Sequence, residues 1–357
     1  MKVIFRTDAS VAIGSGHAMR CLTLAAALRE KGAEVVFICR ELKGNLCAFI
    51  EEKGYRVRRL PVHSDSALQK GLYARWLGVD IETDAAETMA AIEKEGQVRW
   101  LVIDSYAIDK RWEARMRPFV SGIMVIDDLA DREHDCDILL NQNLYDDMEE
   151  RYAGKLPIHC KRLFGPEYAL IRPEFRDARL KRGQRHGSIR RILVFYGGSD
   201  LTNETSKALR AIQSLNMPQV AVDVVVGKAN PNREEIEKHA FALPNAAFYC
   251  QTDDMAELMS RADLALGAGG SSSWERCCMG LPAIVTVVAE NQAAIAENLA
   301  KRGIVINLGW HADAKEADIQ NAVKALMDDR QKVLEMGKRA LGLVDGDGAL
   351  RAVKEMI

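Results

Sequence analysis

Short apolar runs alternate with amphipathic stretches in the first part of the chain, which is the pattern of strands followed by helices. The runs that predict buried strands are residues 2–8, 33–39, 100–104, 122–128 and 137–140. The stretches that predict helices are residues 18–31 and the regions near 43–53, 84–96 and 109–117. Because a strand, a glycine-containing turn, a helix and a second strand form a βαβ unit, this repetition predicts a parallel sheet.

The same alternation begins again after a basic segment that runs from Arg172 to Arg191. Strands are predicted at 191–196, 219–226, 246–250, 262–266 and 283–288. Helices are predicted near 203–215, at 271–279 and 292–301, and over most of the chain from Ala314 onward. We therefore predict an α/β protein of two doubly wound Rossmann-like domains, with a ligand in the cleft at the carboxyl ends of their strands.

Composition and charge narrow the classes of function. The chain has 357 residues, 48% of them hydrophobic, and a net charge of −2, so a disordered chain or a global basic field for nucleic acid is not expected. No apolar run approaches the ~20 residues that cross a bilayer, and the eight cysteines are scattered without a C-x-x-C motif. These features predict a cytoplasmic protein with reduced thiols and no membrane insertion.

The basic segment allows two interpretations. Its arginines could form a nucleic-acid surface, or the end of the segment could be a linker between two domains. Only Phe175 supplies an aromatic ring among these charges, whereas single-stranded nucleic acid is bound by several stacking rings. We favour the linker and expect no nucleic acid as a partner.

The first glycine-rich turn is a candidate site for general base chemistry. Gly14 and Gly16 allow a ligand to approach the backbone, and His17 follows them at the start of the predicted helix. The positive end of that helix disfavours an imidazolium, so we expect a neutral His17 that can accept a proton. Asp8 and Ser10 end the preceding strand; Asp8 could orient His17, hold a substrate hydroxyl or cap the loop.

Two further strand ends in the first half carry polar side chains. Tyr106 could donate a hydrogen bond to a sugar or a phosphate, could shield the cleft from water, or could be only a rim aromatic. Asp127 and Asp128 are adjacent, but no further ligands stand at metal-binding spacing. We favour strand-end capping and substrate hydrogen bonds, and expect no metal and no cofactor.

The second half offers two anion-binding turns. The first contains Gly198 and Ser199, whose amides are open to an anion. The second precedes a predicted helix, and its amides and hydroxyls suit a diphosphate. Its residues are Gly270, Ser271, Ser272 and Ser273. Glu275 could accept hydrogen bonds from a ribose diol or only compensate the helix dipole. The Walker sequence is absent, so a P-loop nucleotidase is not predicted.

Asn291 and Gln292 open the helix that follows the strand 283–288. Asn291 could reach a sugar or act as the helix N-cap, a position at which asparagine is favoured.

Taken together, these motifs resemble the PseG/SpsG family over residues 1 to about 305. The matching stretches are Phe5–Ser10, Ile13–Arg20, Ile103–Tyr106, Val125–Asp128, Cys136–Asn141, Gly165–Arg172, Gly197–Asp200 and Glu290–Gln292. The family often has histidine before the tyrosine of the Asp-x-Tyr motif, whereas this chain has Ser105.

The resemblance implies a GT-B fold, related to MurG glycosyltransferases, and a UDP-sugar hydrolase. PseG enzymes cleave UDP-2,4-diacetamido-2,4,6-trideoxy-β-L-altrose to UDP and the free sugar in pseudaminic acid synthesis, and SpsG proteins are linked to spore-coat polysaccharide. His17, Tyr106 and Asn291 match active-site positions of the family, and the loop 270–273 and Glu275 match its diphosphate and ribose sites. Gln292 extends the matching motif.

From residues and resemblance together we predict a metal-independent hydrolase that acts as a monomer. Residues 1–175 would carry the sugar site and the base, residues 190–345 would bind UDP, and residues 346–357 would form a helix that packs back on the N-terminal domain. His17 would deprotonate a water that attacks the anomeric carbon with inversion. Two rivals remain: a GT-B glycosyltransferase, which would need an acceptor, and a nucleotide-sugar binding protein without turnover.

Overall fold

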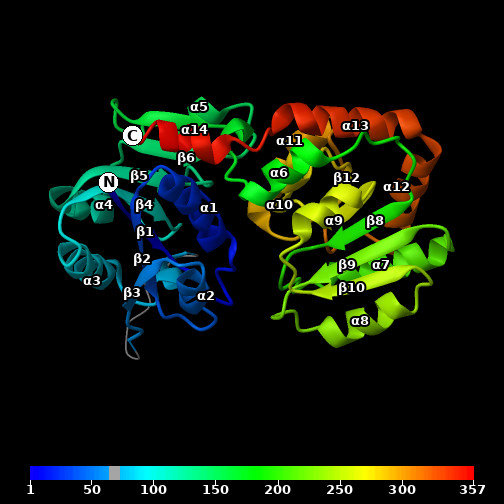
Figure 1. Ribbon diagram of the computed structural model, residues 1–357, viewed down its shortest axis with the longest axis horizontal. Helices are drawn as coiled ribbons and strands as arrows, with labels where there is room; N and C mark the ends of the chain where they lie inside the picture. Colours follow the sequence, from blue (N-terminus) through cyan, green and yellow to red (C-terminus); the bar gives the residue numbers. More distant parts are fainter. Residues whose placement is uncertain (64–72) are drawn as a thin grey trace. The chain divides into compact units, whose positions relative to one another are not determined.

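The computed structural model describes residues 1–63 and 73–357, and it divides into two compact units. Unit 1 comprises Met1–Asn143, Asp147–Leu170 and Asp347–Ile357, so both ends of the chain belong to it (Figure 1). Unit 2 comprises Leu144–Asp146 and Ile171–Gly346. Each unit is a parallel sheet flanked by helices, which confirms the predicted α/β class.

Within the described residues, unit 1 is built on a seven-stranded parallel sheet of order β3-β2-β1-β4-β5-β6-β7. Its strands are β1 (Lys2–Thr7), β2 (Glu34–Arg40), β3 (Arg56–Leu60), β4 (Val98–Asp104), β5 (Val120–Ile126), β6 (Ile138–Asn141) and β7 (Lys161–Phe164). The central strand β1 is buried along nearly its whole length, and Phe5 on it stacks on Phe37 of β2 with ring centroids 5.0 Å apart. Apolar runs form central strands because both faces of a parallel sheet are covered.

Helices of unit 1 cover the two faces of its sheet. They are α1 (Gly16–Glu30), α2 (Cys47–Glu52), η1 (Ala74–Leu77), α3 (Ile81–Glu93), α4 (Lys110–Met116), η2 (Arg117–Phe119), α5 (Met148–Arg151), η3 (Pro166–Tyr168) and α14 (Gly348–Lys354). Helix α14 packs against α1 and η3 and adds Ala352 and Val353 to the core of unit 1, and Met356 joins this core just after the helix. The indole of Trp100 donates a hydrogen bond of 2.8 Å to the Met356 carbonyl.

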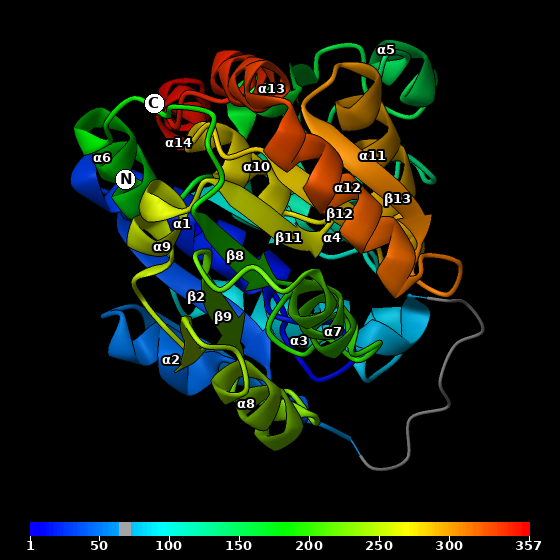
Figure 2. The same ribbon diagram turned by 90° about the vertical axis from the view of Figure 1, so that its right-hand side faces the viewer.

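Unit 2 contains a six-stranded parallel sheet of order β10-β9-β8-β11-β12-β13 among the residues described. Its strands are β8 (Arg191–Phe195), β9 (Ala221–Val226), β10 (Ala246–Cys250), β11 (Leu264–Ala268), β12 (Ala283–Val287) and β13 (Val305–Trp310). Its helices are α6 (Pro173–Lys181), α7 (Glu204–Leu215), α8 (Arg233–Phe241), α9 (Met255–Arg261), α10 (Ser272–Cys278), α11 (Glu290–Lys301), α12 (Glu316–Asp328) and α13 (Arg330–Leu343). Helix α7 packs against both α8 and α12 (Figure 2).

The basic segment from Arg172 to Arg191 belongs to unit 2 rather than standing apart from it. Helix α6 lies within this segment and packs against α9 and α10. The Arg179 guanidinium donates to the carbonyls of Cys278, Leu341 and Val344, at 2.7, 3.0 and 2.9 Å. The side chain of Arg179 therefore holds three backbone carbonyls inside the unit. In the part of the chain that the structure describes, no helix has the length and apolar character needed to cross a membrane.

Candidate active site

The first group of site residues lies where the order of the unit 1 sheet reverses. Strands β1 and β4 are neighbours, but the chain continues from β1 toward β2 and from β4 toward β5, on opposite sides. Thr7 at the end of β1 is in register with Asp104 at the end of β4. Such a switch point leaves a crevice at the strand ends, where α/β proteins bind ligands.

His17 and Asp104 form a buried pair at this point. Nδ1 of His17 lies 2.6 Å from Oδ1 of Asp104, and the two residues are 8% and 1% exposed. A carboxylate accepts hydrogen bonds, so Nδ1 carries a hydrogen, and in the neutral imidazole Nε2 presents its lone pair. An imidazole held in this way can accept a proton at Nε2.

Arg20, one helical turn after His17, balances the charge of Asp104. Its Nε donates to Oδ2 of Asp104 at 2.6 Å and its Nη2 to Oδ1 at 2.7 Å. Burial would raise the pKa of Asp104, but the Arg20 guanidinium and His17 outweigh it and hold that pKa well below its usual value. Asp104 is therefore an ionised orienting group whose charge is already compensated by Arg20.

Tyr106 and Asp128 extend this network. The Tyr106 hydroxyl donates to Oδ2 of Asp128 at 2.6 Å, and Nη1 of Arg20 donates to the same oxygen at 2.6 Å. The rings of Tyr106 and His17 meet edge to face with centroids 4.6 Å apart. Burial and the Asp128 carboxylate raise the pKa of the Tyr106 phenol well above its ordinary value, so the phenol is neutral. Tyr106 thus buttresses the His17 imidazole.

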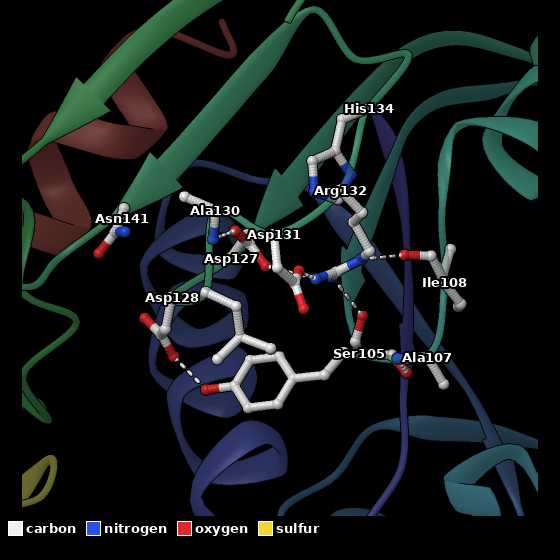
Figure 3. Close-up of polar contacts among 12 residues, drawn as sticks. Ser105, Ala107, Ile108, Asp127, Asp128, Ala130, Asp131, Arg132, His134 and Asn141 are labelled. Atoms are coloured by element: carbon white, nitrogen blue, oxygen red, sulfur yellow. Dashed lines mark hydrogen bonds and ion pairs between the residues drawn. The ribbon is translucent and has the colours of Figure 1, made fainter. Parts of the chain in front are cut away.

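Arg132 fixes the loop that carries Tyr106, and Figure 3 shows its contacts with Ser105 and Ile108 in that loop. Its Nε donates to the carbonyl of Ile108 at 2.7 Å, and its Nη2 to the carbonyl of Ser105 at 3.1 Å. Nη1 pairs with Asp127 at 3.0 Å, and the other oxygen of Asp127 accepts the amide of Ala130 at 2.8 Å (Figure 3).

Asp127 and Asp128 therefore serve different partners. Asp127 holds the loop that follows β5, whereas Asp128 faces Arg20 and Tyr106. Across residues 1–63 and 73–357, no group of three or more His, Cys, Asp or Glu side chains is placed to hold a metal ion.

Asp8 has a capping role and does not orient His17, which corrects one of the sequence alternatives. Its Oδ1 accepts the Arg40 amide at 2.7 Å, and its Oδ2 pairs with Nη1 of Arg6 at 2.7 Å. Asp104 takes the orienting role because β4, distant in sequence, is the neighbour of β1 in the sheet.

Ser10 shapes the turn that leads to His17. Its Oγ accepts the Ile13 amide at 3.0 Å, and its carbonyl accepts the Gly14 amide at 2.8 Å. Gly14 has φ +80°, a conformation that favours glycine. Neither Gly14 nor Gly16 has a neighbouring atom within 4 Å of the place of a Cβ, so both face open space.

In unit 2, the turn after β8 keeps Gly198 and Ser199 exposed. Asp200 anchors this turn, since its carboxylate accepts the amides of Glu204 and Thr205 at 3.0 and 2.9 Å. The backbone of Gly197 has φ +102°, which turns the chain away from the strand.

The turn after β11 divides its three serines between two environments. Ser271 is exposed and Ser272 is partly exposed. Ser273 is only 1% exposed, and its hydroxyl accepts a hydrogen bond of 2.9 Å from Arg276. The expectation that all three hydroxyls face a ligand is wrong for Ser273, because its side chain turns inward at the start of α10.

Three remaining candidates lie around this turn. Oε1 of Glu275 accepts from Nε and Nη2 of Arg172 at 3.2 and 3.1 Å, and burial raises the pKa of Glu275 against the opposing effect of Arg172. A Cβ on Gly270 would lie 3.2 Å from Nε2 of Gln292, so the turn and the start of α11 adjoin. Asn291 is exposed and does not cap α11, whose N-cap is Ala289.

Sequence reasoning missed the side chains that support these candidates: Arg20, Arg132, Arg172 and Arg276. Two local spacings were available as signals: His17 and Arg20 are three residues apart on α1, and Arg276 follows Ser272 and Ser273 by four and three residues on α10. The partners of Arg132 and Arg172 are brought together by the fold.

Two Rossmann-like units in one chain, each with its candidate residues at the carboxyl ends of parallel strands, define the GT-B class of proteins. The crystal structure of MurG from Acinetobacter baumannii has this fold, with a TM-score of 0.69 over 99% of this chain and 98% of that one, at 14% identity. Residues 192–354 match the glycosyltransferase family 28 C-terminal domain.

Two curated relatives place the chain more closely. It is 27% identical over 305 residues to UDP-2,4-diacetamido-2,4,6-trideoxy-beta-L-altropyranose hydrolase of Campylobacter jejuni, which covers 85% of this chain and 97% of that protein. It is 32% identical over 192 residues to the spore coat polysaccharide biosynthesis protein SpsG of Bacillus subtilis, 52% of this chain and 55% of that protein. The resemblance to PseG and SpsG predicted from the motifs is thus confirmed.

Proposed function

We propose that this protein hydrolyses a UDP-sugar, and that its substrate is UDP-2,4-diacetamido-2,4,6-trideoxy-β-L-altrose. The observation that carries the proposal is the His17–Asp104 pair, which leaves one imidazole nitrogen as a proton acceptor at a strand-end crevice. The similarity to the Campylobacter jejuni hydrolase over most of both chains supports this substrate.

The proposed reaction uses Nε2 of His17 to deprotonate a water molecule. The water oxygen attacks the anomeric carbon, the bond from that carbon to the diphosphate oxygen breaks, and UDP leaves with the bonding electrons. The water proton goes to His17, and the configuration at the anomeric carbon inverts. Asp104 stabilises the imidazolium that forms, and Arg20 holds Asp104 in place through its hydrogen bond to Oδ2.

The remaining candidates of unit 1 are proposed to hold the sugar. Tyr106 keeps the His17 ring in place and excludes water from one side of it. The open backbone at Gly14 and Gly16 suits close approach of the substrate, with Ser10 fixing the turn between them and β1. Asp8 contributes by holding this strand end rather than by touching the sugar.

The candidates of unit 2 are proposed to bind UDP. The turns at Gly198–Ser199 and Gly270–Ser272 offer amides and hydroxyls to the diphosphate. Glu275 keeps one oxygen clear of Arg172 for the ribose hydroxyls. Gln292 borders the second turn, and the exposed Asn291 beside it is free to bind the sugar.

A labelled-water experiment tests this proposal directly. The protein would be incubated in H₂¹⁸O with the UDP-sugar and EDTA, without any acceptor. The expected result is UDP without the label and free sugar that carries it, because attack at carbon labels the sugar and attack at phosphorus labels UDP. His17→Ala should abolish the release of UDP, whereas His159→Ala, at a histidine whose side chain is 62% exposed, should leave it unchanged.

A second candidate function is a glycosyltransferase that moves the sugar to an acceptor. The match to the glycosyltransferase family 28 C-terminal domain and the fold shared with MurG favour it. The same experiment separates the two functions, since a transferase releases little UDP until an acceptor is added. Tight UDP binding without hydrolysis of the altrose derivative would therefore favour the transferase.

A further inference from the structure

Arg276 is a buried cation whose acceptors are all uncharged. It lies on α10 and is 3% exposed. Its Nη2 donates to the Ala268 carbonyl at 2.7 Å and to the Ser273 hydroxyl at 2.9 Å, and its Nη1 donates to the Ser272 hydroxyl at 3.1 Å. The guanidinium thus links the end of β11 to Ser272 and Ser273.

The other buried arginines are neutralised in a different way. Arg6 pairs with Asp8 and Asp84, and Arg40 pairs with Asp84 and Glu87. Among the described residues, no carboxylate forms such an ion pair with Arg276. A buried charge without a directly bonded counter-ion is unfavourable, and burial lowers the pKa of Arg276 to about 10 against the opposing effect of neighbours that include Glu275. The free protein therefore holds a positive charge here that an anion would stabilise.

The surrounding backbone is shaped to seat this side chain. A Cβ on Gly267 would lie 2.5 Å from the Phe195 carbonyl and 3.0 Å from Nη1 of Arg276. Only glycine leaves room at this position for the guanidinium and for the neighbouring strand β8. The buried site of Arg276 is therefore shaped by the backbone of two adjoining strands, β8 and β11.

We propose that Arg276 is a positioning residue for the diphosphate of the bound nucleotide, which supplies the missing counter-charge. Its hydrogen bond occupies a lone pair of the Ser272 oxygen, so the hydroxyl hydrogen of this partly exposed serine is free to donate to a phosphate oxygen. The positive charge acts on the diphosphate through a low-dielectric interior, where it is screened little. This inference rests on the proposed function, in that it requires UDP at this turn.

Comparing UDP with uridine tests the assignment. Calorimetry would measure both affinities for the native chain, for Arg276→Met and for Arg276→Lys. We expect Arg276→Met to weaken UDP binding by about tenfold to a hundredfold, the usual effect of losing hydrogen bonds to a charged group, with uridine binding changed less than about twofold. Arg276→Lys keeps the charge and should recover part of the UDP affinity. Arg210→Met, at an exposed arginine of α7, is the control and should bind UDP as the native chain does.

Each outcome decides the matter. An equal loss of UDP and uridine affinity in Arg276→Met would show a purely structural role and overturn the assignment, as would unchanged UDP binding. If Arg276→Met does not fold, Ser272→Ala replaces it, and unchanged UDP affinity in that variant overturns the proposal. A native chain that binds no UDP would overturn the nucleotide site as well. A native chain that binds UDP but does not hydrolyse the sugar nucleotide would refute only the hydrolase function.

Discussion

Nδ1 of His17 lies 2.6 Å from Oδ1 of Asp104, although 87 residues separate them along the chain. The parallel pairing of β1 with β4 causes this closeness, because it brings Asp104 level with the strand end from which the turn to His17 departs. The pair defines the tautomer of His17, and Arg20 balances its charge. The proposed chemistry therefore depends on three side chains from two segments of the chain.

Replacing His17 by alanine should lower the turnover of the UDP-sugar by about 10²–10⁴, the usual contribution of a general base. UDP affinity should stay near the native value, since the proposed nucleotide residues belong to unit 2. Steady-state kinetics and calorimetry measure the two quantities. Near-native turnover with intact UDP binding would exclude His17 as the base.

Replacing Asp104 by asparagine should destabilise unit 1 in a pH-dependent way. The pKa of Asp104 is lower in the folded protein than its value of about 4 in an unfolded chain, so its stabilising effect is complete above pH 4 and is lost as the pH falls further. Breaking this buried pair should lower the free energy of unfolding by about 3–5 kcal/mol at pH 7. Denaturant titrations should therefore show a smaller difference in unfolding free energy between the variant and the native chain at pH 3 than at pH 7. Asp253→Asn, at an exposed aspartate, should show no such trend.

Replacing Tyr106 by phenylalanine removes the hydroxyl but keeps the ring against His17. In this variant Asp128 keeps its ion pair with Arg20 and the hydrogen bond of 3.1 Å that it accepts from Asn143. We expect unfolding to become easier by about 1.5–3 kcal/mol, the range for a hydrogen bond to a charged group. Turnover should fall far less than in His17→Ala. A loss as large as that of His17→Ala would mean that the hydroxyl itself acts on the reacting atoms.

Gly348 and Gly342 form a matched pair for testing how α14 docks on unit 1. A Cβ on Gly348 would lie 2.3 Å from the Ala169 carbonyl oxygen, whereas a Cβ on Gly342 meets nothing within 4 Å. Gly348→Ala should therefore lower the unfolding free energy by about 1–3 kcal/mol through overpacking. Gly342→Ala, at an exposed position of α13, should raise it by about 0.5–1 kcal/mol by restricting the unfolded chain. Thermal unfolding of both variants gives the comparison, and equal effects would contradict this packing.

The strands that sequence patterning predicted are mostly the central ones. The strands at 56–60, 161–164 and 305–310 were not predicted, and all three are at the edge of a sheet. β3, with the sequence Arg-Val-Arg-Arg-Leu, illustrates the reason: its Arg56 and Arg58 reach the Glu95 carboxylate at 2.9 and 2.6 Å. An edge strand faces solvent along one side, so charged side chains interrupt the apolar run that marks a buried strand.

The sequence by itself determined the α/β class, the central strands and the glycine-rich turns, because each depends on the order of residues within a short segment. It also carried the resemblance to PseG and SpsG. Only the tertiary structure decided which side chains meet at those turns. Asp104 rather than Asp8 orients His17, Ser273 turns inward, and no carboxylate of the described residues forms an ion pair with Arg276. The physical reason is that parallel strand order joins segments far apart in sequence, and no local pattern records which strand will be the neighbour.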